Sequence, residues 1–269
     1  MAKIESAFFD VNYLDTLSGQ DTIIHRLDPR AKLIATIVFI FAVVSFGKYE
    51  ISGLLPFFIF PVFLSVLGNL PINYLLKKIL LVAPFAFFIG IFNPFFDQQI
   101  IMQVGPLAIS GGWISFLSIL LRFTLTVGSV FILIATSGFL EICLALEKLK
   151  IPKVFTVQLL FLYRYIFVLI DEAVRLIRAR ALRSFGKKGL GMRVAGSLIG
   201  HLLLRTLDRA RRIYLAMLCR GFDGEIHLRR PFKLTGKDLL FVLLCSTAFI
   251  IMRLFNLPQL LGKILLEIA

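Results

Sequence analysis

Long apolar runs are the feature that most constrains how this chain folds. They lie at residues 31–46, 51–67, 79–96, 113–136 and 239–257. Each is near the roughly 20 residues that an α-helix needs to cross a bilayer, the first being a little short. With 58% hydrophobic residues, the chain carries more apolar surface than a soluble fold of its length usually buries. We therefore predict an all-α integral membrane protein with about five transmembrane helices.

Positive charge is concentrated late in the chain, between Lys148 and Lys237. This stretch holds twenty Lys and Arg residues against five Asp and Glu residues, in a chain of net charge +14. Two patterns within it, at about 154–183 and 190–220, start apolar and predict long helices, each about 45 Å at roughly 1.5 Å per residue. Beside membrane spans, such charge commonly marks the cytoplasmic side. We predict two long basic cytoplasmic helices here.

These patterns divide the chain into three parts. Residues 1–147 hold an N-terminal segment and four spans, 148–237 hold the basic helices, and 238–269 hold a last span and a tail. Segment 97–112 has no Lys or Arg, so it suits the outer side if the N-terminus is cytoplasmic. We expect a multi-pass protein of the cell membrane, in contact with lipid. Apolar stretches within the basic region leave further crossings open.

Two charged residues within the apolar part have competing explanations. Asp28 precedes Pro29 at the start of the first run, where a carboxylate can cap a helix and proline suits the first helical position. Capping is the favoured interpretation of Asp28. Arg122 lies deep in the fourth run, where an ionisable residue is a candidate for a functional role, although pairing with a neighbouring helix or snorkelling explains it equally well.

Patterns for catalysis and metal binding are absent or weak in the sequence. The fragment nearest to a nucleotide-binding phosphate loop, residues 235–238, lacks both the first glycine and the final hydroxyl residue. The histidines and cysteines have no common ligand spacing; they are His25, His201, His227, Cys143, Cys219 and Cys245. Asp223, Glu225 and His227 alternate, but a solvated loop is the favoured interpretation. We assign no catalytic residue, metal ligand or cofactor.

Each long basic helix is predicted to end near a triad with a central arginine. The triads are Ala179, Arg180 and Ala181, and Cys219, Arg220 and Gly221. A cation before a glycine also suits a helix C-terminus for structural reasons alone. That explanation does not account for a similar triad near the end of the other helix. We interpret both arginines as contacts for a partner.

Three blocks of sequence resemble the transmembrane T component of energy-coupling factor (ECF) transporters, and within it the cobalt-transporter CbiQ branch. They are HRLDPRAKL at 25–33, IPKV at 151–154 with YRY at 163–165, and AMLCRGFDG at 216–224. The last block is the most specific. The resemblance implies that Arg180 and Arg220 are the central arginines of two coupling-helix signatures. Here the triads read Ala-Arg-Ala and Cys-Arg-Gly, where the family more commonly has Ala-Arg-Gly.

The resemblance also implies a division of labour. Two cytoplasmic ATPase subunits would dock on these arginines and hold the nucleotide, while a separate membrane S component of the cobalt-binding type would bind the substrate. This chain would transmit movement between them without catalysing a reaction. Nickel or a vitamin is the alternative cargo. A membrane enzyme acting on anionic lipid would need a metal cluster or an activated nucleophile, and a nucleic-acid binder would need interleaved aromatics, so we expect no nucleic-acid partner.

Overall fold

The computed structural model describes residues 13, 15–97, 100–104, 107–183, 191–224 and 234–255 of the 269. The chain divides into two units. The bundle unit comprises residues 15–142 and 232–269, and the arm unit comprises residues 1–14 and 143–231. Helix α6 runs through the boundary between them.

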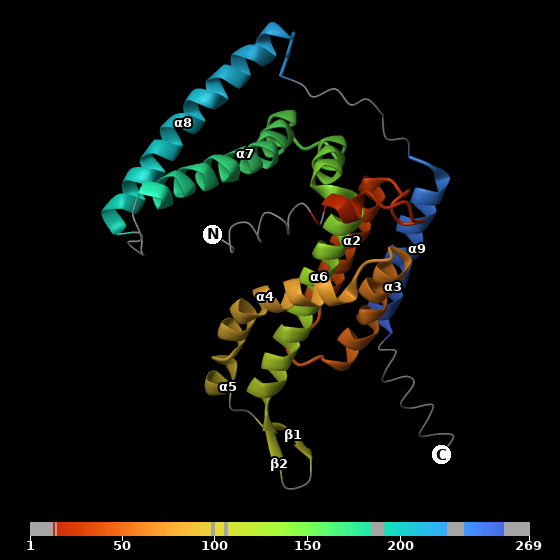
Figure 1. The fold of residues 1–269 in the computed structure, drawn as a ribbon. Coiled ribbons are helices and arrows are strands. Elements are labelled where there is room, and N and C mark those ends of the chain that lie inside the picture. The colour runs from red at the N-terminus through yellow and green to blue at the C-terminus, as the bar shows by residue number, and fades with distance from the viewer. Residues whose placement is uncertain are drawn as a thin grey trace. The chain divides into compact units, whose positions relative to one another are not determined.

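The described part of the chain is helical apart from one hairpin (Figure 1). The bundle unit contains α2 (Pro29–Val44), the 3-10 helix η1 (Ser52–Phe58), α3 (Ile59–Leu67), α4 (Ile72–Gly90), α5 (Asn93–Phe96), most of α6 (Gly111–Lys148) and α9 (Gly236–Leu254). The arm unit contains α7 (Lys153–Arg183) and α8 (Met192–Cys219). Strands β1 (Ile100–Val104) and β2 (Leu107–Ser110) pair antiparallel within the segment expected as an external loop. The prediction of an all-α membrane protein is confirmed, with this hairpin added.

Three described helical segments are long and apolar enough to cross a membrane: Ile72–Phe95, Gly111–Lys148 and Lys153–Arg183. The expected first span is a helix of only 16 residues, and the second is a shorter apolar helix in two pieces, η1 and α3, with a proline in η1. Helix α9 has 19 residues but carries three charged ones, Lys237, Asp238 and Arg253. The third candidate, α7, was expected in the cytoplasm, and its apolar first half gives it the length and composition of a span.

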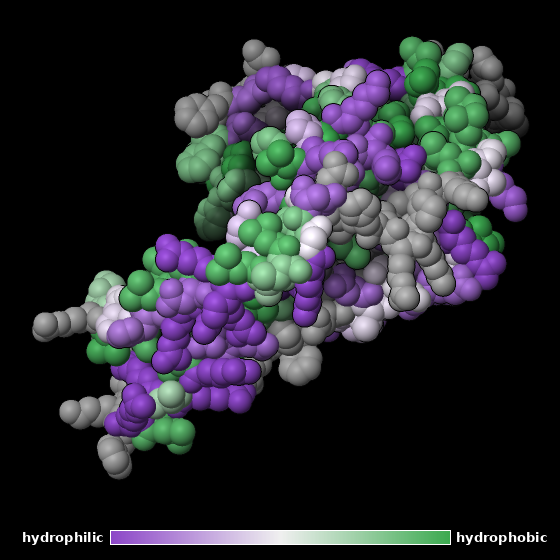
Figure 2. Space-filling model, turned by 90° about the horizontal axis from the view of Figure 1, so that it is seen from above, coloured by the Kyte–Doolittle hydropathy of each residue, from purple (hydrophilic) through white to green (hydrophobic). Residues whose placement is uncertain are grey.

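Much of the apolar surface of this chain is not covered by the chain itself. Figure 2 shows broad hydrophobic areas beside hydrophilic ones on one face of the molecule. In α4, for example, Leu80, Leu81 and Phe85 are each about 70% exposed. Exposed aliphatic and aromatic side chains on a helix of this length are what a bilayer stabilises.

The core of the bundle unit is a cluster of phenylalanines from four segments. Phe39 of α2 contacts Phe60 of α3, with ring centroids 4.7 Å apart, and Phe249 of α9, at 5.3 Å. Phe57 of η1 contacts both Phe39 and Phe249. Offset and edge-to-face packing of this kind stabilises aromatic pairs by about 0.5–1.5 kcal/mol beyond the buried area. The cluster holds α2 and α9 side by side.

Polar contacts join the same two helices at their N-terminal ends. Asp28 caps α2 by accepting a hydrogen bond from the backbone N–H of Arg30 at 2.9 Å, which confirms the capping interpretation. The backbone N–H of Asp28 in turn donates to Asp238 Oδ1 at 2.9 Å, 210 residues later in the chain. Asp238 Oδ2 accepts from the backbone N–H of Thr235 at 2.8 Å, as part of a capping box at the start of α9. The Asp238 carboxylate therefore accepts hydrogen bonds at the N-terminal ends of both α2 and α9.

Helix α6 is interrupted at Gly138, whose φ of 71° and ψ of 154° are not helical. A break of this kind frees carbonyls in the preceding turn. The carbonyl of Thr136 accepts a hydrogen bond from the buried Lys32 Nζ at 2.8 Å. A Cβ atom at position 138 would lie 2.8 Å from Ser18 Oγ, so both the space and the positive φ favour glycine.

The backbone is closely packed around Gly112, at the start of α6. A Cβ atom there would lie 2.5 Å from the Cα of Pro94 and 2.7 Å from the carbonyl oxygen of Asn93, both backbone atoms that cannot rotate away. We expect Gly112→Ala to lower the free energy of unfolding by about 1–3 kcal/mol, the usual cost of overpacking. Thermal unfolding in mild detergent measures this. Gly196→Ala, in α8 with nothing within 4 Å of the added atom, is the matched control and should not destabilise.

Candidate docking site on helices α7 and α8

Helices α7 and α8 match the two long helices predicted from the charge pattern. The prediction placed them at about 154–183 and 190–220, and the structure places them at Lys153–Arg183 and Met192–Cys219. The glycines between them, at 186 and 189, lie outside the described residues. Within the arm unit the two helices contact one another along much of their length.

The pair is antiparallel, because contacts between the two helices run in opposite orders along the chain. These contacts are Phe161 with Phe222 (ring centroids 5.9 Å apart), Glu172 with Arg205 (Oε1 to Nη1, 3.0 Å), and Arg183 with Val194 across a shared groove. Within α7 alone, Arg175 lies three residues after Glu172, a spacing that allows an ion pair. Among the described residues Glu172 instead pairs across the helices, because α8 brings Arg205 opposite its carboxylate.

Arg220 occupies the C-cap of α8, and its position is fixed by the backbone. Gly221 has a φ of 79°, which lets its N–H donate to the carbonyl of Leu218 and the N–H of Phe222 donate to that of Met217, both at 3.0 Å. This is a Schellman motif, the common glycine-dependent end of a helix. The motif turns Phe222 back onto Phe161 of α7 and leaves Arg220 exposed.

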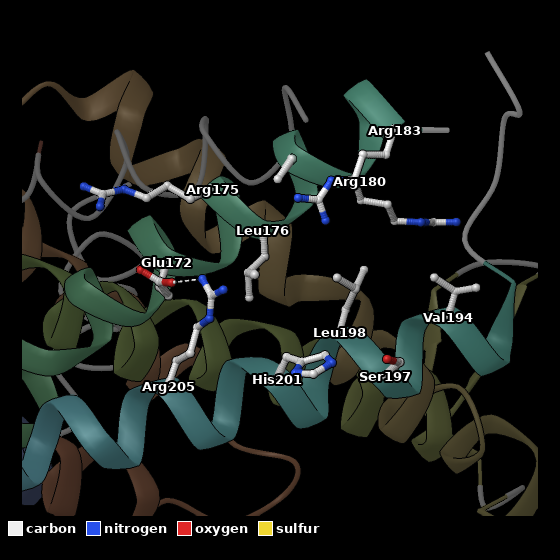
Figure 3. Close-up of a pocket in the computed structure, with 11 residues that line it drawn as sticks. Glu172, Arg175, Leu176, Arg180, Arg183, Val194, Ser197, Leu198, His201 and Arg205 are labelled. Atoms are coloured by element: carbon white, nitrogen blue, oxygen red, sulfur yellow. Dashed lines mark hydrogen bonds and ion pairs between the residues drawn. The ribbon is translucent and has the colours of Figure 1, made fainter. Parts of the chain in front are cut away.

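Arg180 lies one turn before the end of α7 and is half-buried, while its neighbours Ala179 and Ala181 are exposed. Its side chain lines a groove of approximately 630 Å³ between α7 and α8 (Figure 3). Small flanking residues leave the backbone around Arg180 open to an approaching surface. Exposure is the property that the sequence prediction requires of both triads, and all six residues have at least partial exposure.

The antiparallel arrangement separates the two triads instead of bringing them together. Arg220 lies near the Phe161 end of α7, whereas Arg180 is nineteen residues further along that helix. At 1.5 Å per residue the two arginines are about 28 Å apart along the pair. They therefore present two separate contact points, one toward each end of the α7–α8 pair.

The other sequence candidates fall elsewhere. Among the described residues no group of three or more His, Cys, Asp and Glu lies together as metal ligands require. Of the three alternating residues considered as metal ligands, only Asp223 is described. Glu225 and His227 lie outside the described residues. The fragment at 235–238 forms the capping box of α9. Arg122 donates a hydrogen bond to the backbone carbonyl of Gly47, so its partner lies in the connection after α2 and not in a neighbouring helix.

Sequence reasoning missed four residues that surround Arg180 in the groove: Arg183, Ser197, His201 and Arg205. A signal for them was present. Ser197, His201 and Arg205 follow one another at intervals of four on α8, and Arg183 follows Arg180 by three, so each set lies on one helix face. What the sequence lacked was the register that turns these two faces toward one another.

Comparison with known proteins places the chain in a family. Residues 20–230 match the family model CbiQ, described as cobalt transport protein. The chain is 29% identical over 238 residues to the energy-coupling factor transporter transmembrane protein EcfT of Bacillus subtilis, covering 81% of this chain and 88% of the relative. It is 34% identical over 98 residues to the cobalt transport protein CbiQ of Salmonella typhimurium, covering 36% of this chain and 43% of the relative.

A third relative, an uncharacterized protein of Methanocaldococcus jannaschii, is 29% identical over 245 residues, which is 87% of this chain and 83% of the relative. The family match covers well over half of the chain, including α7 and both arginine triads. The chain therefore belongs to the CbiQ family, and with the EcfT proteins among its relatives it is a transmembrane component of an ECF-type transporter.

Proposed function

We propose that this chain is the coupling subunit of an ATP-driven importer, and that Arg180 and Arg220 each dock one of two cytoplasmic ATPase subunits. The observation that carries the proposal is the placement of the two signature arginines at opposite ends of the α7–α8 pair, about 28 Å apart along its axis. Two separated contacts suit two copies of a partner better than one. Guanidinium groups suit such contacts because their planar fork binds carboxylates and carbonyls in a bidentate manner.

Coupling in this proposal means transmission of movement, without chemistry on this chain. The ATPase subunits hold and hydrolyse the nucleotide, and a separate membrane subunit holds the cargo. The side chains of Thr235 and Asp238, within the fragment nearest to a phosphate loop, are engaged in capping α9. The long helices give the arm unit the stiffness that a lever needs, since α7 has 31 residues and α8 has 28.

We propose that the cargo is cobalt and that the protein lies in the cell membrane. The basic region of the arm unit faces the cytoplasm, and the apolar first half of α7 enters the bilayer. The family description and the similarity to the Salmonella protein support cobalt. The excess of Lys and Arg between residues 148 and 237 supports the cytoplasmic side, with the N-terminus on that side too.

Coexpression with nucleotide-binding and substrate-binding subunits from the same organism tests the proposal. We expect all three kinds of subunit to copurify on this chain in mild detergent. We also expect cells to accumulate radioactive cobalt only when the ATPase subunits are competent for hydrolysis. Uptake of nickel in place of cobalt would correct the cargo alone. Failure of this chain to bind any nucleotide-binding subunit would overturn the coupling function.

A further inference from the structure

The break in α6 at Gly138 lies in the bundle unit, shortly before the arm unit begins at residue 143. Beyond the break, α6 continues to Lys148 and so enters the residues of the arm unit. Helices bend where the regular hydrogen bonds of the backbone are interrupted. In the proposed function, this chain transmits movement from the ATPase subunits to the substrate-binding subunit. A broken helix absorbs such movement as bending unless another contact bridges the break.

Lys32 of α2 contacts the segment of α6 that precedes the break. The residue is only 4% exposed, and its Nζ donates to the carbonyl oxygen of Thr136 at 2.8 Å. Thr136 lies two residues before Gly138. An ammonium group that donates to a carbonyl makes a charge-assisted hydrogen bond, which is stronger than one between neutral groups. This bond fixes the start of α2 to the first segment of α6.

The same ammonium group attracts a carboxylate on the other side of the break. Glu141 lies three residues after Gly138 and is half-buried. It attracts the charge of Lys32 more strongly than do the carboxylates at the starts of α2 and α9. Opposite charges attract more strongly in a buried site than in water, because the surroundings screen them less. Lys32 therefore links the two segments of α6 across the break.

A lysine suits this double contact better than a neutral donor. Removing an ammonium group from water is costly, and a neutral donor would satisfy the carbonyl of Thr136 without that cost. A neutral donor would not attract Glu141. The positive charge is therefore explained by the contact beyond the break and not by the carbonyl alone.

We propose that Lys32 is the positioning residue that lets the broken helix α6 transmit movement as one lever. The inference rests on the proposed function, because it concerns how movement of the arm unit reaches the bundle unit. Lys32 holds the two segments of α6 in a fixed arrangement. It also connects them to the starts of α2 and α9, which are hydrogen-bonded to one another through Asp238. Without the ammonium group, movement is lost as bending at Gly138.

Cobalt uptake per ATP hydrolysed tests the role of Lys32. The chain is copurified with its ATPase and substrate-binding subunits and reconstituted into liposomes, where radioactive cobalt uptake and ATP hydrolysis are measured together. We expect the Lys32→Met complex to keep its ATPase subunits and to hydrolyse ATP, while the cobalt taken up per ATP falls by about tenfold, a common size for coupling between sites. Glu141→Gln removes only the attraction beyond the break and should lower the same ratio less.

Arg253→Met is the matched control. Arg253 also donates to a backbone carbonyl in the bundle unit, that of Ser45 at 3.0 Å, at the opposite end of α2 from Lys32. Its loss should leave the cobalt taken up per ATP unchanged. A loss of stability alone lowers uptake and hydrolysis together, so it does not change their ratio.

An unchanged ratio in Lys32→Met would overturn the inference, as would equal falls in Lys32→Met and Arg253→Met. Should Lys32→Met fail to assemble, an unchanged ratio in Glu141→Gln would overturn it as well. Failure of the unaltered chain to bind ATPase subunits would instead overturn the coupling function on which the inference rests.

Discussion

Reversing the charge of either signature arginine should weaken assembly with the ATPase subunits. We expect Arg180→Glu and Arg220→Glu each to weaken that binding by at least about 2–5 kcal/mol, the usual cost when one partner of a buried charged contact is lost. Reversal adds repulsion to that loss. A factor of ten in affinity corresponds to about 1.4 kcal/mol, so each single variant should retain much less ATPase subunit in a pull-down. Cobalt uptake should fall with it, at equal abundance of the variants in the membrane.

Two further variants separate a specific contact from general electrostatic attraction. Arg→Lys at position 180 or 220 should be partly disabling, because an ammonium group keeps the charge but not the planar fork. Arg212→Glu is the matched control, an exposed arginine on α8 that belongs to neither triad. Its loss should be much smaller. Equal losses at Arg180, Arg212 and Arg220 would mean that the arm unit attracts its partners without specific arginine contacts.

Sequence patterns predicted the features of this chain that depend on neighbouring residues. The bounds of α7 and α8, the cap at Asp28 and the glycine stop after Arg220 all follow from helix periodicity and end signals over a few residues. These local preferences are physical properties of short segments. They need no knowledge of how distant parts of the chain pack.

The features that could not be predicted are those that depend on packing between distant segments. The pairing of Glu172 with Arg205 requires the register of two helices separated by an undescribed connection. Arg175, three residues along the same helix, offered Glu172 an equally good partner in sequence, and only the packing of α8 decides between Arg175 and Arg205. The placement of the triads at opposite ends of the pair follows from the same register, since each triad by itself reports only where a helix ends.

The double role of Asp238 is a second example, and it leads to the largest effect on stability that we expect. The residue Asp238 is only 4% exposed. Its carboxylate accepts hydrogen bonds from the backbone N–H groups of Asp28 and Thr235. Removing these acceptors leaves a buried N–H unpaired, which costs about 1–3 kcal/mol, and removes a helix cap, which costs about 0.5–2 kcal/mol. We expect Asp238→Ala to lower the free energy of unfolding by roughly 2–4 kcal/mol.

Asp238→Asn separates hydrogen bonding from charge. The Asp238 carboxylate also attracts the buried ammonium group of Lys32, so both the asparagine and the alanine variant lose that attraction. Asparagine removes the charge but keeps one acceptor oxygen, so its destabilisation should be smaller than that of alanine. The control is Asp21→Ala, which breaks an exposed ion pair with Arg26 and should change stability little. Thermal unfolding in one detergent compares the three variants, and a midpoint for Asp238→Ala equal to that of Asp21→Ala would show that the 28–238 contact does not stabilise the bundle unit.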